Sequence, residues 1–410
     1  MRLLHTSDWH LGKHLYGQRR TDEFDAFLSW LADTLAQQQV DVLIVAGDIF
    51  DTNTPSNTAQ QQYYRFLHQV ATQHCQHVVV IAGNHDSATF LEAPKSLLHD
   101  LNVHVVGVTD PEAIHEQVLL LHDRNGHALG IVCAVPYLRD RDVRPSQAGE
   151  SVTDKDRNLV DAIHAHYAAI AQLAIERQQA LPSPVPIVAT GHLFTAGGQT
   201  VDGDGVRELY VGSLGYIHAS AFHEAFDYVA LGHLHVPQRV ANQDRIRYCG
   251  SPIPMGFNEA TQQKLVCLVE LTAQQPPVIT ELPVPSFQRL QQVRGSWEEI
   301  SAQINALVAA QQSVWVEVLY QDALLISDLR ERVQALVEGT AVEVLRIQNR
   351  PLVDQVLTQQ AATECLSELR HDQVFERCLQ AHSIPEAQQA ELIPYYQQAV
   401  QSLHDDDPQA

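Results

Sequence analysis

The 410-residue sequence predicts an α/β fold, because short apolar runs alternate with amphipathic helical patterns. The runs at residues 40–46 and 78–81 are rich in Val and Ile, which is typical of strands covered on both faces. Residues 22–38 carry large apolar side chains at helical spacing. With a first strand at residues 2–7, this order of strand, helix and strand makes a βαβ unit with a parallel sheet.

Further elements follow in the same alternation. We expect helices at residues 55–73, 93–99 and 158–179, and strands at 103–106, 184–190, 228–231, 247–249 and 265–271. The apolar runs at 118–121 and 128–135 flank an Asn-Gly pair, which is a hairpin signal. The sheets therefore contain antiparallel members, and the later strands form a second half-sheet.

A Gln-Gln-Pro-Pro stretch at residues 274–277 predicts a domain boundary. Strand and helix patterns alternate again between 287 and 347, without a cluster of ligand-type residues, and we interpret this unit as a lid or specificity domain. The end of the chain carries two amphipathic helical patterns, which suit docking on a partner helix or packing back on the same chain. The predicted domains are residues 1–272, 280–350 and 351–410.

Composition limits the possible partners and compartments. A net charge of −23 disfavours wrapping nucleic acid over a broad surface, so a polyanionic substrate would have to be met locally, through bound cations or with a partner. No apolar run approaches the roughly 20 residues of a membrane span, and the N-terminus does not resemble a signal peptide. Six scattered cysteines without a Cys-x-x-Cys pair favour reduced thiols in a cytoplasmic protein.

The candidate functional residues follow the predicted strand ends. The strand at 78–81 leads into Gly83-Asn84-His85-Asp86, where we expect Asp51 or Asp86 to orient the His85 imidazole. One such turn is also explained by ordinary turn preferences, but the pattern recurs after other strands. Strand ends collect functional groups, so we expect one crevice lined by Asp8, His10, Asp48, Asn84, His85, His192, His233 and His235.

These residue types predict a two-metal centre. Seven ligands suffice for two divalent ions, and Asp48 can bridge cations about 3.5–4 Å apart. The ions would lower the pKa of a bridging water, polarise a phosphoryl oxygen and supply the local positive charge that this acidic chain lacks. His85, which is not needed as a ligand, could donate a proton to the leaving oxygen.

Two weaker signals each leave two interpretations open. The loop at residues 11–20 contains Lys13, Arg19 and Arg20, which could contact phosphates or simply be solvated. The predicted helix at 55–73 carries Tyr63, Tyr64 and Phe66, which could form a self-association surface or pack in the core.

The motifs Asp8-x-His10, Gly47-Asp48-x-x-Asp51, Gly83-Asn84-His85-Asp86, Gly191-His192 and Gly232-His233-x-His235 resemble, in order, the signatures of the calcineurin-like metallophosphoesterases. Within that superfamily, the segments at residues 7–12, 47–51 and 231–235 resemble the family of SbcD nuclease subunits. The superfamily resemblance covers roughly residues 1–272, and the SbcD resemblance extends over nearly the whole chain.

The resemblance implies a metallophosphoesterase β-sandwich of mixed sheets flanked by helices, a small α/β capping domain and C-terminal helices. It implies that one manganese ion is held by Asp8, His10, Asp48 and His235. A second would be held by Asp48, Asn84, His192 and His233, with His85 as the general acid.

It further implies a DNA nuclease that acts in replication, recombination and repair. With an SbcC-type coiled-coil ATPase docked on the C-terminal helices, the complex would be a 3′–5′ double-strand exonuclease and a single-strand endonuclease that opens hairpins. The chain would form a homodimer within a heterotetramer. The shared motifs alone leave open another phosphodiesterase, acting on nucleotides or phosphoproteins.

Overall fold

The computed structural model describes residues 1–144, 150–198, 217–322, 326 and 328–349. These residues fall into two compact units. The first comprises residues 1–292, 307–317 and 339–346, and the second contains the described parts of 293–306 and 318–338. The candidate site lies in the first unit.

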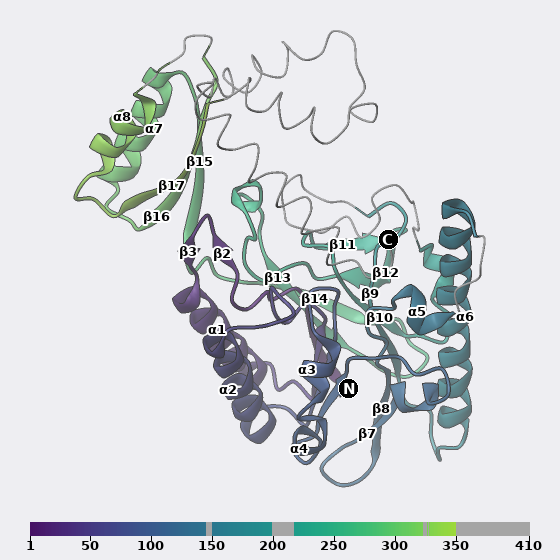
Figure 1. The fold of residues 1–410 in the computed structure, drawn as a ribbon. Helices are drawn as coiled ribbons and strands as arrows, with labels where there is room; N and C mark the ends of the chain where they lie inside the picture. The colour runs from purple at the N-terminus through teal and green to yellow at the C-terminus, as the bar shows by residue number, and fades with distance from the viewer. Residues whose placement is uncertain (145–149, 199–216, 323–325, 327, 350–410) are drawn as a thin grey trace. The chain divides into compact units, whose positions relative to one another are not determined.

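The first unit contains two six-stranded mixed sheets (Figure 1). The first sheet has the order β14 (Val278–Pro283), β13 (Leu265–Glu270), β1 (Arg2–Thr6), β4 (Val42–Ala46), β5 (His77–Ile81) and β6 (Val103–Val106). The second has the order β11 (Gln238–Val240), β12 (Gln243–Tyr248), β10 (Tyr228–Gly232), β9 (Ile187–His192), β8 (Ala128–Cys133) and β7 (Val118–His122). Four neighbouring strands are parallel in each sheet: β1, β4, β5 and β6 in the first, and β12, β10, β9 and β8 in the second. The remaining strands pair with their neighbours in antiparallel orientation.

Helices cover the outer faces of both sheets. In Figure 1, α1 (Thr21–Gln37) and α2 (Asn57–Gln73) lie outside the first sheet, and α6 (Val152–Gln179) lies outside the second. Shorter helical segments are α3 (Ala88–Glu92), α4 (Lys95–His99), α5 (Asp140–Val143), η1 (Ile114–Gln117), η2 (Ala219–Ala221) and η3 (Phe257–Glu259). A small hairpin is formed by β2 (His14–Leu15) and β3 (Gln18–Arg19).

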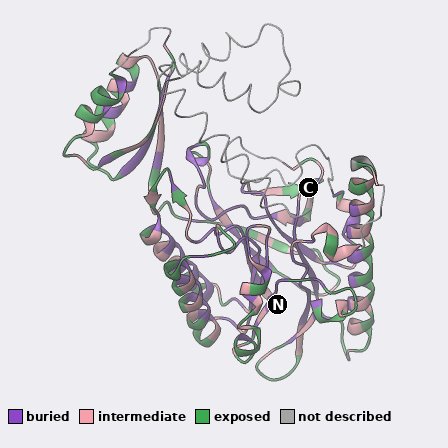
Figure 2. Ribbon diagram, in the orientation of Figure 1, coloured by how far each residue is buried: buried purple, intermediate pink, exposed green. Residues whose placement is uncertain are grey.

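Strand alternation divides the core between the layers. Leu3 and Ile44 lie in the cluster between the two sheets, whereas their neighbours Leu4 and Leu43 lie in the cluster under α1 and α2. The buried strands of both sheets form the continuous interior in Figure 2. The predicted α/β fold of mixed sheets flanked by helices is thus confirmed.

Two sequence-based interpretations are decided or extended by the structure. Of the two interpretations of the aromatic residues on α2, the structure supports core packing, because Tyr63 and Phe66 are almost fully buried under α2 and Tyr64 packs partly against the same cluster. The strand β14 follows Pro277 and pairs with β13, so the first sheet continues past the expected boundary. Apolar spacing does not show which surface a helix face meets, and a Pro-rich turn between two strands does not show whether the second strand leaves the sheet.

The predicted alternation of strands and helices near the C-terminal end is present. The strands β15 (Arg289–Gly295), β16 (Val314–Tyr320) and β17 (Val342–Asn349) form a three-stranded sheet. The helices α7 (Trp297–Ala309) and α8 (Leu329–Val337) bury Ile300, Ile304, Leu329 and Val333. The expected C-terminal helices fall on residues 350–410, outside the described part. Among the described helices, none combines the length and apolar character required to cross a bilayer.

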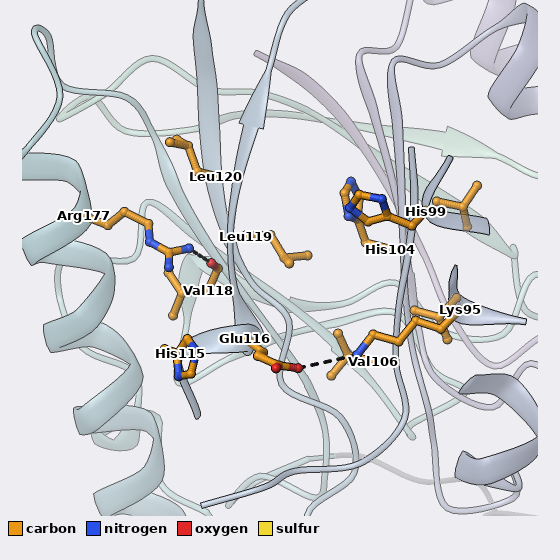
Figure 3. A pocket seen from close by; sticks show the side chains of 12 residues that line it. Lys95, His99, His104, Val106, His115, Glu116, Val118, Leu119, Leu120 and Arg177 are labelled. Carbon is orange, nitrogen blue, oxygen red and sulfur yellow. Dashed lines mark hydrogen bonds and ion pairs between the residues drawn. The ribbon is translucent and has the colours of Figure 1, made fainter. Parts of the chain in front are cut away.

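A pocket of about 400 Å³ opens between the outer strands β6 and β7 (Figure 3). Its lining is largely aliphatic, and its two cationic side chains already have partners. Arg177 donates to the backbone oxygen of Val118, and Lys95 lies 3.8 Å from Glu116. None of the strand-end candidates lines this pocket.

Trp9, between two candidate ligands, couples the core to the site. Its ring is fully buried and packs edge-on against Phe27 and Phe66, and its Nε1 donates to Thr6 Oγ1 at 3.0 Å. We expect Trp9→Ala to lower the free energy of unfolding by about 3–5 kcal/mol, since it leaves a large cavity. Urea denaturation of the cation-free protein measures this loss. Trp9→Phe, which retains most of the packing, should lose clearly less, and equal losses would contradict the packing role.

Candidate metal centre

The candidate residues come from strand ends in both sheets. Asp8 and His10 follow β1, Asp48 follows β4, and Asn84 and His85 follow β5, all in the first sheet. The others belong to the second sheet, where His192 ends β9 and His233 and His235 follow β10. All are buried except Asn84, which is half-buried. The crevice is therefore built across two sheets and not along one.

Four of these residues have an uncommon backbone conformation. The φ angles of Asp8, His10, Asp48 and His233 are 53°, 49°, 51° and 99°, in the left-handed region that L-residues rarely occupy. Such residues cost of order 1–3 kcal/mol each and cluster at functional sites. Main-chain hydrogen bonds support them: the amide of Asp8 donates to Gly47 O and that of His10 to Asp48 O, both at 3.0 Å.

The side chains converge into two groups. Asp8, His10 and His235 form one group, and Asp48, His192 and His233 form the other, with ligand atoms within 4.8 Å of one another in each. The carboxylate of Asp48 lies between the groups, because its Oδ2 is 3.6 Å from His10 Nε2 and 3.3 Å from His192 Nε2. The structure thus brings the strand ends together around a shared carboxylate.

The amide oxygen of Asn84 belongs to the second group. Its Oδ1 lies 2.9 Å from His192 Nε2 and 3.1 Å from His233 Nδ1. The amide nitrogen of Asn84 is buried and has no hydrogen-bond partner among the described residues. The amide oxygen of Asn84, and not its nitrogen, therefore faces the imidazoles of His192 and His233.

The ring nitrogens are arranged for cations. Nδ1 of His192 lies 2.9 Å from the carbonyl oxygen of Ala46, which can only accept, so Nδ1 carries the hydrogen and Nε2 faces the site. Nε2 of His10 and Nε2 of His235 face each other at 3.2 Å beside Asp8. Such a set of carboxylate, amide and imidazole ligand atoms suits divalent ions such as manganese, iron or zinc.

Electrostatics differ between the imidazoles. Burial lowers the pKa of His10 to about 4, which keeps its ring neutral and available as a ligand. Burial also acts against protonation of His192, but the neighbouring Asp48 carboxylate outweighs it and raises the pKa to about 9. Burial disfavours ionised Asp48, yet the surrounding imidazoles, His192 above all, hold its pKa well below the usual value. The cation-free site thus contains a protonated His192 paired with ionised Asp48.

His85 differs from the ligand candidates in its contacts. Its backbone amide donates to Asp48 Oδ1 at 2.8 Å, and its ring stands edge-on to that of His10 with centroids 4.7 Å apart. Its Nδ1 lies 2.9 Å from the backbone oxygen of Asp51, an acceptor that fixes the hydrogen on Nδ1. In the neutral ring the lone pair is then on Nε2. His85, His10 and Asp51 also form a group whose ligand atoms lie within 4.8 Å of one another.

Of the two residues expected to orient His85, the structure places Asp51 there, through its backbone oxygen, and not Asp86. The fully buried Asp86 carboxylate accepts the backbone amides of Ile49, Phe50 and Gly83 at 3.1, 3.0 and 2.8 Å. It ties the turn after β4 to the turn after β5, which explains its place in the motif. Burial, with the nearby Asp48 charge, raises its pKa to about 7.

The phosphate-contact interpretation also fails for Arg20. Its guanidinium is buried against Glu23 at 2.7 Å and donates to Pro254 O, so it is part of the core. Lys13 pairs with Asp51 at 3.1 Å beside the site.

Two buried residues near the site escaped the sequence analysis. The Glu259 carboxylate lies 3.5 Å from His235 Nδ1, and Lys264 pairs with Glu259. Burial opposes ionisation of Glu259, but His235 and Lys264 lower its pKa to about 2. Neither residue directly follows a predicted strand, and no spacing signal distinguishes them from surface charges.

Comparison with known proteins supports this description of the fold. Residues 1–237 match the family model described as calcineurin-like phosphoesterase, and residues 286–383 match the model described as type 5 capsule protein repressor C-terminal domain. The chain is 38% identical to the SbcD subunit of the SbcCD nuclease from Escherichia coli K12 over 96% of both chains. It is 35% identical to the corresponding SbcCD nuclease subunit from Rhodobacter capsulatus over 70% of both, and 34% identical to that from Bacillus subtilis over 66% of both.

Among solved structures, a β-glucosidase from Exiguobacterium marinum aligns with 80% of this chain and 77% of its own at 10% identity and a TM-score of 0.21, which is too low to show a shared fold. The sequence matches, in contrast, define a class: the chain is a calcineurin-like phosphoesterase, a class that uses divalent metal ions. Within that class, the chain belongs to the family of SbcD subunits of SbcCD nucleases.

The His192 pKa gives a prediction about cation binding. Below about pH 9 the cation-free protein holds a proton on His192, and a cation needs the neutral ring, so binding must release that proton. At pH 7.5 we expect release of about one proton per chain, declining above pH 9. Titration calorimetry with Mn²⁺ in two buffers of different ionisation enthalpy measures it. The variant of the exposed His127, His127→Gln, should behave like the unaltered chain, and a buffer-independent enthalpy would contradict the His192–Asp48 pairing.

Proposed function

We propose that this chain is the metal-dependent nuclease subunit of an SbcCD-type complex and hydrolyses phosphodiester bonds in DNA. One cation, manganese in this proposal, would be held by Asp8, His10, Asp48 and His235, and the other by Asp48, Asn84, His192 and His233. The observation that carries the proposal is the convergence of these side chains in two groups that share Asp48. The similarity over 96% of an SbcD subunit supports DNA as the substrate.

The chain's own groups suggest how the reaction proceeds. When bound, the two cations supply Lewis acidity for attack on phosphorus. His85 would donate its Nε2 proton to the leaving oxygen, while Asp51 O keeps the other hydrogen on Nδ1. The hydrogen bond from the His85 amide to Asp48 holds the acid at a fixed place beside the shared carboxylate.

The remaining parts of the proposal concern organisation. Residues 1–272, extended by β14 at Val278–Pro283, would form the nuclease domain, the rest of 280–350 the cap that selects the form of DNA, and 351–410 the docking segment for an SbcC-type ATPase. With that partner the chain would act as a 3′–5′ double-strand exonuclease and a hairpin-opening endonuclease, as a homodimer within a heterotetramer. The four free, buried cysteines of the described part, Cys75, Cys133, Cys249 and Cys267, suit a reducing cytoplasm.

Purified protein with Mn²⁺ should cleave linear duplex and hairpin DNA, and a parallel assay with cyclic nucleotides tests the alternative phosphodiesterase. We expect His85→Ala to lower DNA cleavage by about 10²–10⁴-fold, since it removes the proton donor, and to retain two bound cations. Cleavage is followed on labelled DNA and metal content by elemental analysis, with the exposed His127→Ala as the control.

The outcomes separate the components of the proposal. Turnover of cyclic nucleotides without DNA cleavage would remove the nuclease function. Loss of one cation in His85→Ala would reassign His85 as a ligand, in line with its place beside His10 and Asp51.

A chain ending at residue 350 tests the docking segment. It keeps both sheets and the candidate site, so we expect metal-dependent cleavage to persist while co-purification with the SbcC-type partner is lost. Size-exclusion chromatography of the mixed subunits measures the association. ATP-stimulated cleavage that survives the truncation would show that docking lies elsewhere.

A further inference from the structure

A buried lysine and a buried glutamate next to the candidate site have no role in the ligand set. The side chain of Glu259 is fully buried and that of Lys264 is 4% exposed. Charges so placed are costly unless paired and hydrogen-bonded. The contacts of Lys264 and Glu259 indicate what this buried ion pair does in the structure.

Lys264 fixes the position of Glu259. Its Nζ contacts Glu259 Oε2 at 2.5 Å, Ser251 Oγ at 3.0 Å and the backbone oxygen of His235 at 3.1 Å. Glu259 Oε2 also accepts the backbone amide of Met255 at 3.0 Å. One carboxylate oxygen is therefore held by an ammonium and an amide, so the direction of the other oxygen is determined.

That other oxygen faces a candidate ligand. Glu259 Oε1 lies 3.5 Å from Nδ1 of His235, on the side of the ring opposite Nε2. A carboxylate there favours the tautomer with hydrogen on Nδ1, which leaves the Nε2 lone pair directed at the site. Nε2 of His235 lies 3.2 Å from Nε2 of His10, within the group formed with Asp8.

We propose that Glu259, held by Lys264, is the positioning residue of His235 and sets the cation affinity of the group formed by Asp8, His10 and His235. This inference rests on the proposed function, because it assumes that this group binds a cation. Glu259 acts through the imidazole and does not itself reach the cation.

The other imidazoles show why the effect should be confined to one group. His10 Nδ1 lies 3.4 Å from Asp51 Oδ1, and Asp51 pairs with Lys13, which repeats the order of histidine, carboxylate and lysine at the same group. His192, in the second group, instead donates Nδ1 to the neutral carbonyl of Ala46. Loss of the Glu259 charge should therefore weaken one cation and spare the other.

The test compares Glu259→Gln with a surface control in the full-length chain. The variant keeps the size of the side chain and removes its charge. We expect one of two Mn²⁺ ions to bind about 10–100-fold more weakly, the range typical of outer-shell partners, while the second keeps its affinity. Titration calorimetry gives both affinities, and electron paramagnetic resonance detects the coupled pair of Mn²⁺ ions independently of activity. Glu270→Gln, at the exposed pair with Arg2, should match the unaltered chain.

Cleavage adds a second readout. High Mn²⁺ concentration should restore DNA cleavage by Glu259→Gln close to the unaltered rate, since only occupancy is impaired. Unchanged affinity at both sites would overturn the inference while leaving the proposed function intact. Failure of the unaltered chain to bind two cations would instead count against the proposed function itself.

A second variant covers the case in which Glu259→Gln does not fold. Glu259→Asp keeps the charge and the Lys264 partner but shortens the side chain, so the carboxylate is drawn away from His235. The same selective loss of affinity is expected from it, whereas Lys264→Arg, which retains a cation beside Glu259, should lose less. Equal, unselective weakening of both cations in Glu259→Asp would contradict the assignment.

Discussion

The close approach of the two sheets at their strand ends is the constraint on which the site depends. A Cβ atom on Gly232 would overlap the carbonyl oxygen of Ala46, on the opposite sheet. A Cβ on Gly47, which also has a φ of 88°, would overlap Nδ1 of His192. Only glycine permits this separation, and the separation is what lets Asp48 of one sheet contact His192 of the other.

The strain in the site is balanced by the packing beneath it. Asp8 and His10 both have left-handed backbone conformations, and the residue between them is the fully buried Trp9. Main-chain hydrogen bonds join this turn to the turn after β4, and Asp86 joins the latter to the turn after β5. The side chains of the site are therefore held by contacts of the protein itself.

The parts of the site that the sequence predicts are those encoded locally. Apolar runs followed by Gly and a polar residue can be recognised in the sequence. The placement of Asp48 and His192 at strand ends could therefore be predicted. The role of Glu259 could not, because it is set by contacts with segments far along the chain. The spacing of Tyr63 and Phe66 likewise identifies an apolar helix face, but a sequence does not state whether that face meets its own sheet or a second chain. In the structure it meets the core beneath the site.

The charge of the chain and the chemistry of the site are linked. A net charge of −23 repels DNA over most of the surface, and the cations near the site, Lys13 and Lys264, are already paired with carboxylates. In the proposed function, local attraction for a phosphodiester would come from bound metal ions or from a partner, and the converging groups of Asp8 and Asp48 would hold those ions. The same ions would both attract the phosphates of the DNA backbone and activate them for hydrolysis. A chain of this charge would therefore bind DNA at the place where it can also cleave it.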